Sequence, residues 1–110
     1  MAKDVLGELE HHVLLALMRL GSDGYSVPIV NELEERTGRE IAPAAVYITL
    51  RRLEKKGLVR SKLRTASRQQ GGHERRYYTV TAKGRVRILE ARRVYLNLWE
   101  GMDPSLESGK

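Results

Sequence analysis

Residues 44–59, AAVYITLRRLEKKGLV, form one amphipathic helical pattern with two different faces. At about 100° per residue, Val46, Leu50 and Leu53 lie within about 60° of one another and form an apolar stripe. The opposite face carries small, apolar or cationic side chains, namely Ala44, Ile48, Arg51, Arg52 and Lys55. The stripe predicts a helix that packs on a core. The cations predict that the other face of this helix binds an acidic partner.

Two helices are expected before this stretch. The first is predicted over about residues 4–20, with Asp4 as its cap. Its apolar residues recur every three or four positions: Leu6, Leu9, Val13, Leu17 and Leu20. The sequence GSDG at 21–24 ends this helix, and a second helix is expected between Ser26 as its N-cap and Gly38 after its last turn.

The third helix and two strands follow. Pro43 in a first turn opens the third helix, which is expected to run to Lys56 before Gly57 ends it. Residues 58–64 and 75–81 are rich in β-branched, aromatic or alternating side chains, which is typical of strands. A long antiparallel hairpin with a basic tip is therefore expected.

The last helix is predicted over residues 82–102. Apolar residues step through it by three and four positions, as in a heptad seam: Ile88, Ala91, Tyr95, Leu98 and Met102. Residues 103–110, DPSLESGK, are expected to form a flexible tail. The predicted fold class is mostly α with a small β-hairpin (α+β), in one domain over residues 1–102.

Composition narrows the class of protein further. The chain has 110 residues and no cysteine, so disulfides and thiolate metal sites are excluded. The longest apolar run, VLLALM at 13–18, is too short to span a bilayer, and the first residues do not resemble a signal peptide. A cytoplasmic protein without a membrane partner is expected.

Charge is distributed unevenly along the chain. Residues 1–50 contain 4 Lys and Arg against 8 Asp and Glu, whereas residues 51–93 contain 15 against 3. Arginine dominates the basic block, and its planar guanidinium suits phosphate. A basic block beside an acidic one favours an oriented polyanion site over a merely solvated surface.

Three helices followed by a basic two-stranded hairpin is the element order of a winged helix-turn-helix. In that arrangement the third helix enters the DNA major groove, which is about 12 Å wide, and the hairpin wing lies along the adjacent backbone or minor groove. Here the third helix and the hairpin are also the two elements that carry the cations.

Two motifs resemble the PadR-like transcriptional regulators of the short type. VYITLRRLEKKGLV (46–59) matches a Tyr-x-x-Leu-x-x-Leu-Glu-x-x-Gly-Leu pattern, and RRYYTVTAKG (75–84) resembles the wing strand and the start of the last helix. DGYSVPIVNELEERTG (23–38) is similar to the second helix, so the resemblance covers about residues 6–102. It implies a homodimeric regulator, more often a repressor, and in some members an aromatic effector at the dimer centre. Ala42 and Ala45 stand where the family often has hydroxyl residues, which puts the usual backbone contacts there in doubt.

The candidate DNA contacts are Ala44, Ala45, Tyr47, Ile48, Arg51, Arg52 and Lys55 on the third helix, and Lys62, Arg64, Arg68, Arg75 and Arg76 on the hairpin. The Tyr47 ring is expected to pack while its hydroxyl reaches a phosphate, and Arg68 is the minor-groove candidate. Tyr77 and Tyr78 are expected on opposite faces of the hairpin. The candidate dimer residues are Leu6, Leu9, Val13, Ile88, Ala91, Tyr95, Leu98 and Met102. Tyr95 and Trp99, one turn apart, belong either to the dimer core or to an effector pocket.

No catalytic, cofactor or metal site is expected. His11 and His12 point about 100° apart on a helix, and no nucleophile has a positioned base. The resulting hypothesis is a homodimer that binds a palindromic operator and is released by a small ligand. An architectural or RNA-binding module and a protein-interaction adaptor remain as alternatives.

Overall fold

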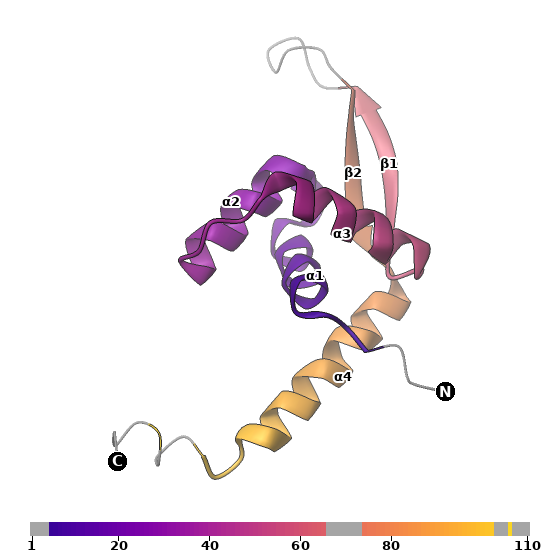
Figure 1. The fold of residues 1–110 in the computed structure, drawn as a ribbon. Helices are drawn as coiled ribbons and strands as arrows, with labels where there is room; N and C mark the ends of the chain where they lie inside the picture. The colour runs from indigo at the N-terminus through magenta and orange to yellow at the C-terminus, as the bar shows by residue number, and fades with distance from the viewer. Residues whose placement is uncertain (1–4, 66–73, 103–105, 107–110) are drawn as a thin grey trace.

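The computed structural model describes residues 5–65, 74–102 and 106 of the chain. Helices precede and follow a single hairpin in the order α1 (Glu8–Leu20), the 3-10 turn η1 (Gly21–Asp23), α2 (Ser26–Thr37), α3 (Pro43–Lys55), β1 (Val59–Thr65), β2 (Glu74–Val80) and α4 (Ala82–Trp99) (Figure 1). The α+β class and the element order are those expected from the sequence.

The core lies where α1, α2 and α3 pack against one another and against the base of the hairpin. α1 supplies Leu14, α2 supplies Ile29 and α3 supplies Leu50, and none of the three has exposed surface. The complete set of buried apolar residues is Val13, Leu14, Ala16, Leu17, Ile29, Leu33, Val46, Leu50, Leu53, Leu58, Val59, Tyr78 and Ile88. Because α3 buries its apolar stripe here, its cationic face points to solvent.

The two strands pair antiparallel from Val59 opposite Val80 to Thr65 opposite Glu74. A third segment joins the free edge of β2, where the Tyr78 N–H donates to the Gly24 carbonyl at 2.7 Å. A Cβ on Gly24 would lie 2.7 Å from both the Leu17 side chain and the Tyr78 carbonyl oxygen. Glycine at this position therefore allows the segment before α2 to hold the hairpin close to the core.

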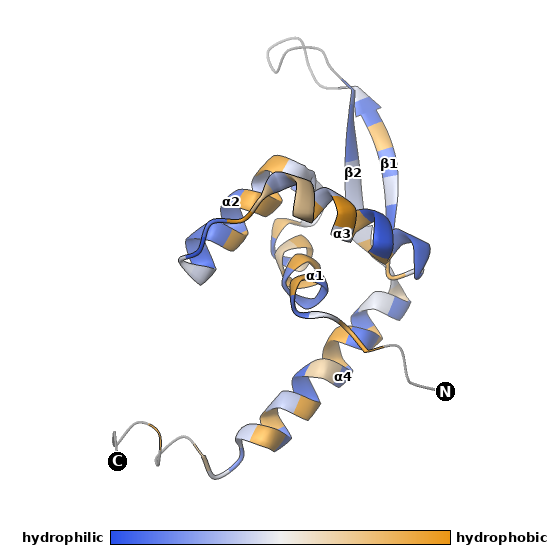
Figure 2. Ribbon diagram, in the orientation of Figure 1, coloured by the Kyte–Doolittle hydropathy of each residue, from blue (hydrophilic) through white to orange (hydrophobic). Residues whose placement is uncertain are grey.

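α4 begins tightly packed and then leaves the body of the molecule. Thr81 caps it by accepting a hydrogen bond from the Gly84 N–H at 3.1 Å. A Cβ on Gly84 would lie 2.2 Å from the Leu58 carbonyl oxygen, so only glycine permits this approach. Beyond Ile88 the helix leaves the core and extends past the other elements at its far end (Figure 1), and most of its apolar residues, marked along the ribbon in Figure 2, are exposed. None of the helices in the described ranges is long and apolar enough to cross a membrane.

Some boundaries differ from the sequence expectation. α1 begins at Glu8 with Gly7 as its N-cap, and the Glu10 carboxylate accepts from the Gly7 N–H at 2.8 Å. The predicted cap Asp4 lies outside the described residues, as does the tail except for residue 106. α4 ends at Trp99 rather than at residue 102. A seam of apolar residues predicts where a helix packs but not where its last hydrogen bonds form.

Candidate nucleic-acid interface

The outward face of α3 is set by its opposite, buried face. Pro43 occupies the first turn, and Val46, Leu50 and Leu53 are fully buried. The 100° step between residues then leaves an exposed surface made by Ala44, Tyr47, Ile48, Arg51, Arg52 and Lys55. Ala45 is only partly exposed. Ala42, the N-cap, makes no side-chain cap hydrogen bond.

A groove separates α3 from the hairpin. Its volume is about 650 Å³, and it is lined by Tyr47, Ile48, Arg51, Arg52, Glu54, Lys55, Arg76 and Tyr78. Arg76 comes from β2, so the groove joins cations of two elements that are separated in the sequence. This surface, called the α3–wing groove below, gathers arginine and lysine side chains of the kind that bind phosphate.

Tyr47 lies on the groove rather than against the core. Half of its surface is exposed, and its hydroxyl accepts a hydrogen bond from Arg51 Nη1 at 3.1 Å. The hydrogen bond to this hydroxyl is the main reason why the pKa of Arg51 is raised. The ring was expected to pack, and the structure leaves half of the residue exposed, because Val46 and Leu50 already fill the core side of α3.

A carboxylate connects α3 to the hairpin inside this cationic groove. Glu54 accepts a hydrogen bond from Ser61 Oγ at 2.7 Å, and Ser61 Oγ accepts one from Arg76 Nη1 at 2.9 Å. In the sequence Glu54 is part of the motif at 46–59, and no role was predicted for it. The only available signal was a single acid, Glu54, in an otherwise basic helix end.

The hairpin divides its predicted cations between two faces. Arg76 and Tyr78 share the face toward α3, whereas Arg64, Arg75 and Tyr77 share the other face, as strand alternation and the register require. Tyr78 is buried and Tyr77 is half-buried, which agrees with the expected opposite orientation. Lys62 is exposed on the same face as Arg64. Arg68 lies outside the described residues.

Arg64 and Arg75 are engaged on that second face. Arg64 Nη2 donates to the Ser22 carbonyl at 2.7 Å, and its guanidinium lies 3.6 Å from the centre of the Tyr77 ring. The Arg75 guanidinium lies 4.6 Å from the centre of the Tyr25 ring. The structure thus brings only part of the predicted contact set into the α3–wing groove.

The predicted dimer residues also fall into two groups. Val13 and Ile88 are buried in the core of the protomer, so they have almost no surface left for a partner. Leu6 and Leu9 are partly buried, as is Ala91. Tyr95, Leu98 and Met102 are about half or more exposed on α4.

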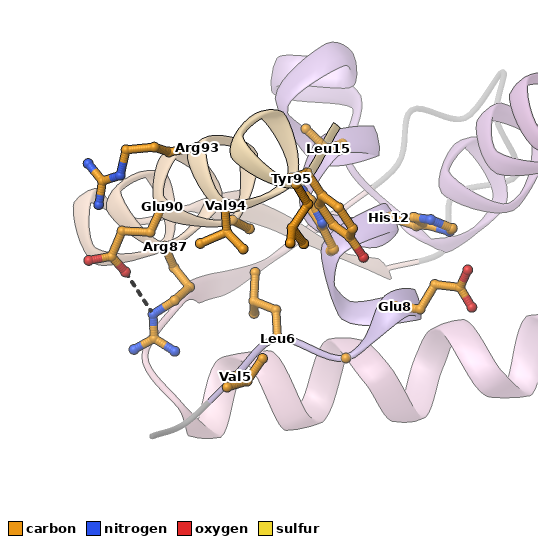
Figure 3. A pocket seen from close by; sticks show the side chains of 14 residues that line it. Val5, Leu6, Glu8, His12, Leu15, Arg87, Glu90, Arg93, Val94 and Tyr95 are labelled. Carbon is orange, nitrogen blue, oxygen red and sulfur yellow. Dashed lines mark ion pairs between the residues drawn. The ribbon is translucent and has the colours of Figure 1, made fainter. Parts of the chain in front are cut away.

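A second cavity lies between α4 and the segment that leads into α1 (Figure 3). It has a volume of about 750 Å³, and its lining includes Leu6, His11, Val94, Tyr95 and Leu98 but not Trp99. The rings of His11 and Tyr95 stack with their centres 6.1 Å apart. Burial is the main cause that lowers the pKa of His11, and the nearby His12 lowers it further. The neutral form of His11 is therefore favoured.

Residues 14–90 match the model of the transcriptional regulator PadR-like family. The chain belongs to this family. A PadR family regulator from Eggerthella lenta is similar in structure, with 29% identity, a TM-score of 0.69, and coverage of 91% of this chain and 87% of that chain. A PadR-like transcription factor from Bacteroides fragilis has 25% identity, a TM-score of 0.72 and 84% coverage of both chains.

A more distant structure, BpsR from Bordetella bronchiseptica, shares the fold. Its identity is 21%, its TM-score is 0.66, and the match covers 99% of this chain and 76% of that chain. No curated protein sequence matches the chain significantly. Membership of the PadR-like family makes the chain a DNA-binding transcriptional regulator with a winged-helix fold, and not an enzyme.

Proposed function

We propose that α3 enters the major groove of an operator and that the hairpin lies along the neighbouring backbone. The observation that supports this most strongly is the convergence of cations from α3 and β2 on the α3–wing groove. Ala44, Ala45 and Ile48 near the start of α3 would meet base edges. The phosphate contacts would come from Arg51, Arg52, Lys55 and Arg76, with Tyr47 beside them and Lys62 at the edge of the hairpin.

The same proposal includes a homodimer formed through α1 and α4. α4 has apolar residues on more of its circumference than its own protomer covers: Val86, Leu89, Val94, Tyr95, Leu96, Leu98 and Trp99 are all exposed. An exposed apolar surface of this extent is typical of a protein interface. Two protomers related by a twofold axis would place two copies of α3 on a palindromic operator, where binding would repress transcription.

A small aromatic effector would act at the cavity beside Tyr95. Apolar side chains and the Tyr95 ring suit a flat ligand. Arg87 and Arg93 also line the cavity, together with Glu8 and Glu90, and Arg87 is paired with Glu90 at 3.7 Å (Figure 3). The structural relative BpsR is described with its DNA binding regulated by 6-hydroxynicotinic acid. An effector that favours one angle between protomers would separate the two copies of α3 from their half-sites. Aromatic acids that release the protein from DNA should lose this effect when Ala91→Trp fills the cavity.

Selection of bound fragments from the host genome, followed by footprinting, tests the proposed function. We expect a palindromic duplex with two protected half-sites whose centres lie about 10–10.5 bp apart or at a multiple of that spacing. Genes beside the recovered fragments would indicate the effector. Recovery of fragments without a common sequence would instead favour a non-specific architectural protein.

A further inference from the structure

Four side chains form a continuous stack on the face of the hairpin that points away from α3. Arg64 lies over the Tyr77 ring at 3.6 Å, and Arg75 lies over the Tyr25 ring at 4.6 Å. The two tyrosine rings contact each other with their centres 5.1 Å apart and a tilt of 59°. Arg64, Tyr77, Tyr25 and Arg75 are called the outer-face stack below.

The outer-face stack joins elements that are distant in the sequence. Arg64 belongs to β1, Tyr77 and Arg75 belong to β2, and Tyr25 is the N-cap residue of α2. Arg64 also donates to the Ser22 carbonyl in η1 at 2.7 Å. Together with the Tyr78–Gly24 backbone hydrogen bond, these contacts fix the hairpin to residues 22–25 at the start of α2.

The geometry of Arg64 favours a role in holding the hairpin against residues 22–25 over a role in binding DNA. Its planar guanidinium uses one face for the Tyr77 ring and one N–H for a backbone carbonyl, and both contacts depend on the shape of the group as much as on its charge. Arg60 and Lys62 lie on the same strand face and are exposed, so the hairpin has other cations for phosphate.

We propose that the outer-face stack positions the wing, and that Arg64 acts in it as a positioning residue and not as a phosphate contact. This inference rests on the proposed function, because the position of the wing matters when α3 and the hairpin bind one duplex together. The stack sets the hairpin against α2 from one side, while the Glu54–Ser61–Arg76 chain connects it to α3 from the other side. The width of the α3–wing groove is then fixed before DNA arrives.

Charge-conserving substitution separates the two roles of Arg64. On a duplex recovered by selection, we expect Arg64→Lys to bind roughly 3- to 10-fold more weakly than the unmodified protein, since a lysine keeps the charge but loses the planar stack. The dependence of affinity on salt should remain that of the unmodified protein. Arg60→Lys is the matched control on the same strand face, and we expect its affinity to stay within about twofold because it has no stack to lose.

Amide hydrogen exchange gives a second measurement that needs no DNA. Arg64→Lys and Tyr25→Leu should speed exchange in β1, whereas Tyr25→Phe keeps the ring and should leave exchange unchanged. The proposal is overturned if Arg64→Lys binds and exchanges like the unmodified protein while Arg64→Gln lowers the salt slope by about 0.9 per protomer, as the loss of a phosphate contact would. If the unmodified protein selects no duplex, the proposed function fails, and the exchange rates still decide whether the stack holds the hairpin.

Discussion

At the scale of single residues, Glu10 is a charged group that the fold itself requires. It is 4% exposed, and its carboxylate accepts from the Gly7 N–H at 2.8 Å and from Lys56 Nζ at 2.9 Å. Lys56 is the C-cap of α3, so this pair connects the start of α1 with the end of α3. Burial alone would raise the pKa of Glu10, but the Gly7 N–H and Lys56 lower it below the ordinary 4.5.

A lowered pKa in the folded state makes the stabilisation by Glu10 depend on pH. The contribution is complete above about pH 4.5, the ordinary value, and is lost as pH falls through the lower folded pKa. At pH 7 we expect Glu10→Gln to reduce the free energy of unfolding by about 2 kcal/mol, because Lys56 loses its charged partner. Urea unfolding at several pH values should show this difference shrinking below pH 4.5.

Glu35→Gln provides the control for this measurement. Glu35 is exposed on α2, so its variant should stay within about 0.5 kcal/mol of the unmodified protein at each pH. If the Glu10→Gln difference stays constant from neutral to acid pH, the carboxylate charge does not stabilise the fold.

At the scale of elements, local patterns predict what each segment forms but not what it contacts. The third helix and both strands were predicted to within about a residue, because Pro43, Gly57 and the strand alternation are local signals. Strand alternation places Arg75 and Arg76 on opposite faces, but what each face contacts could not be predicted, since this depends on Tyr25 and Ser22 lying beside β1 and β2. The Glu54 and Glu10 hydrogen bonds likewise join segments whose proximity only the fold creates.

The caps of α3 and α4 offer a direct contrast between two helix starts. Ala42 has extended backbone angles suited to an N-cap but no side-chain oxygen, whereas Thr81 makes its cap bond to Gly84. We expect Ala42→Ser to raise the free energy of unfolding by about 1 kcal/mol and Thr81→Ala to lower it by at least as much. Thermal unfolding should register the first change as an increase of about 4 °C.

Ala44→Ser is the control for the α3 cap, because a hydroxyl two residues further along is no longer at the N-cap position. Its melting temperature should not rise. An equal rise for Ala42→Ser and Ala44→Ser would show that the gain comes from surface polarity and not from capping.

At the scale of the whole molecule, the protomer exposes a cationic surface in one place and an apolar surface in another. The α3–wing groove presents cations, and α4 presents apolar residues over a projecting arm (Figure 2). A dimer through α4 would cover the apolar surface and leave both grooves open to DNA. The heptad spacing predicted this arm, but Ile88 at the start of the seam packs within one protomer, as does Val13 of α1 from the predicted dimer set.

A matched pair of variants on two different faces of α4 tests the dimer. Leu98 is 68% exposed on the apolar side, and Asn97 lies about 100° away on the polar side. We expect Leu98→Glu to sediment as a monomer at micromolar concentration and to lose most of its affinity for the selected duplex. Asn97→Glu should remain a dimer. If the Leu98→Glu protein remained a dimer, the interface would have to lie on another surface.

The most direct test of the α3–wing groove is the salt dependence of binding to the selected duplex. With about 6 to 10 phosphate contacts, affinity should fall roughly 10³- to 10⁵-fold between 50 and 200 mM salt. Arg51→Gln should reduce the slope by about 0.9 per protomer, while Arg39→Gln, an exposed cation outside the groove, should leave it unchanged. A slope that Arg51→Gln and Arg39→Gln affect alike would show that DNA is bound by another surface.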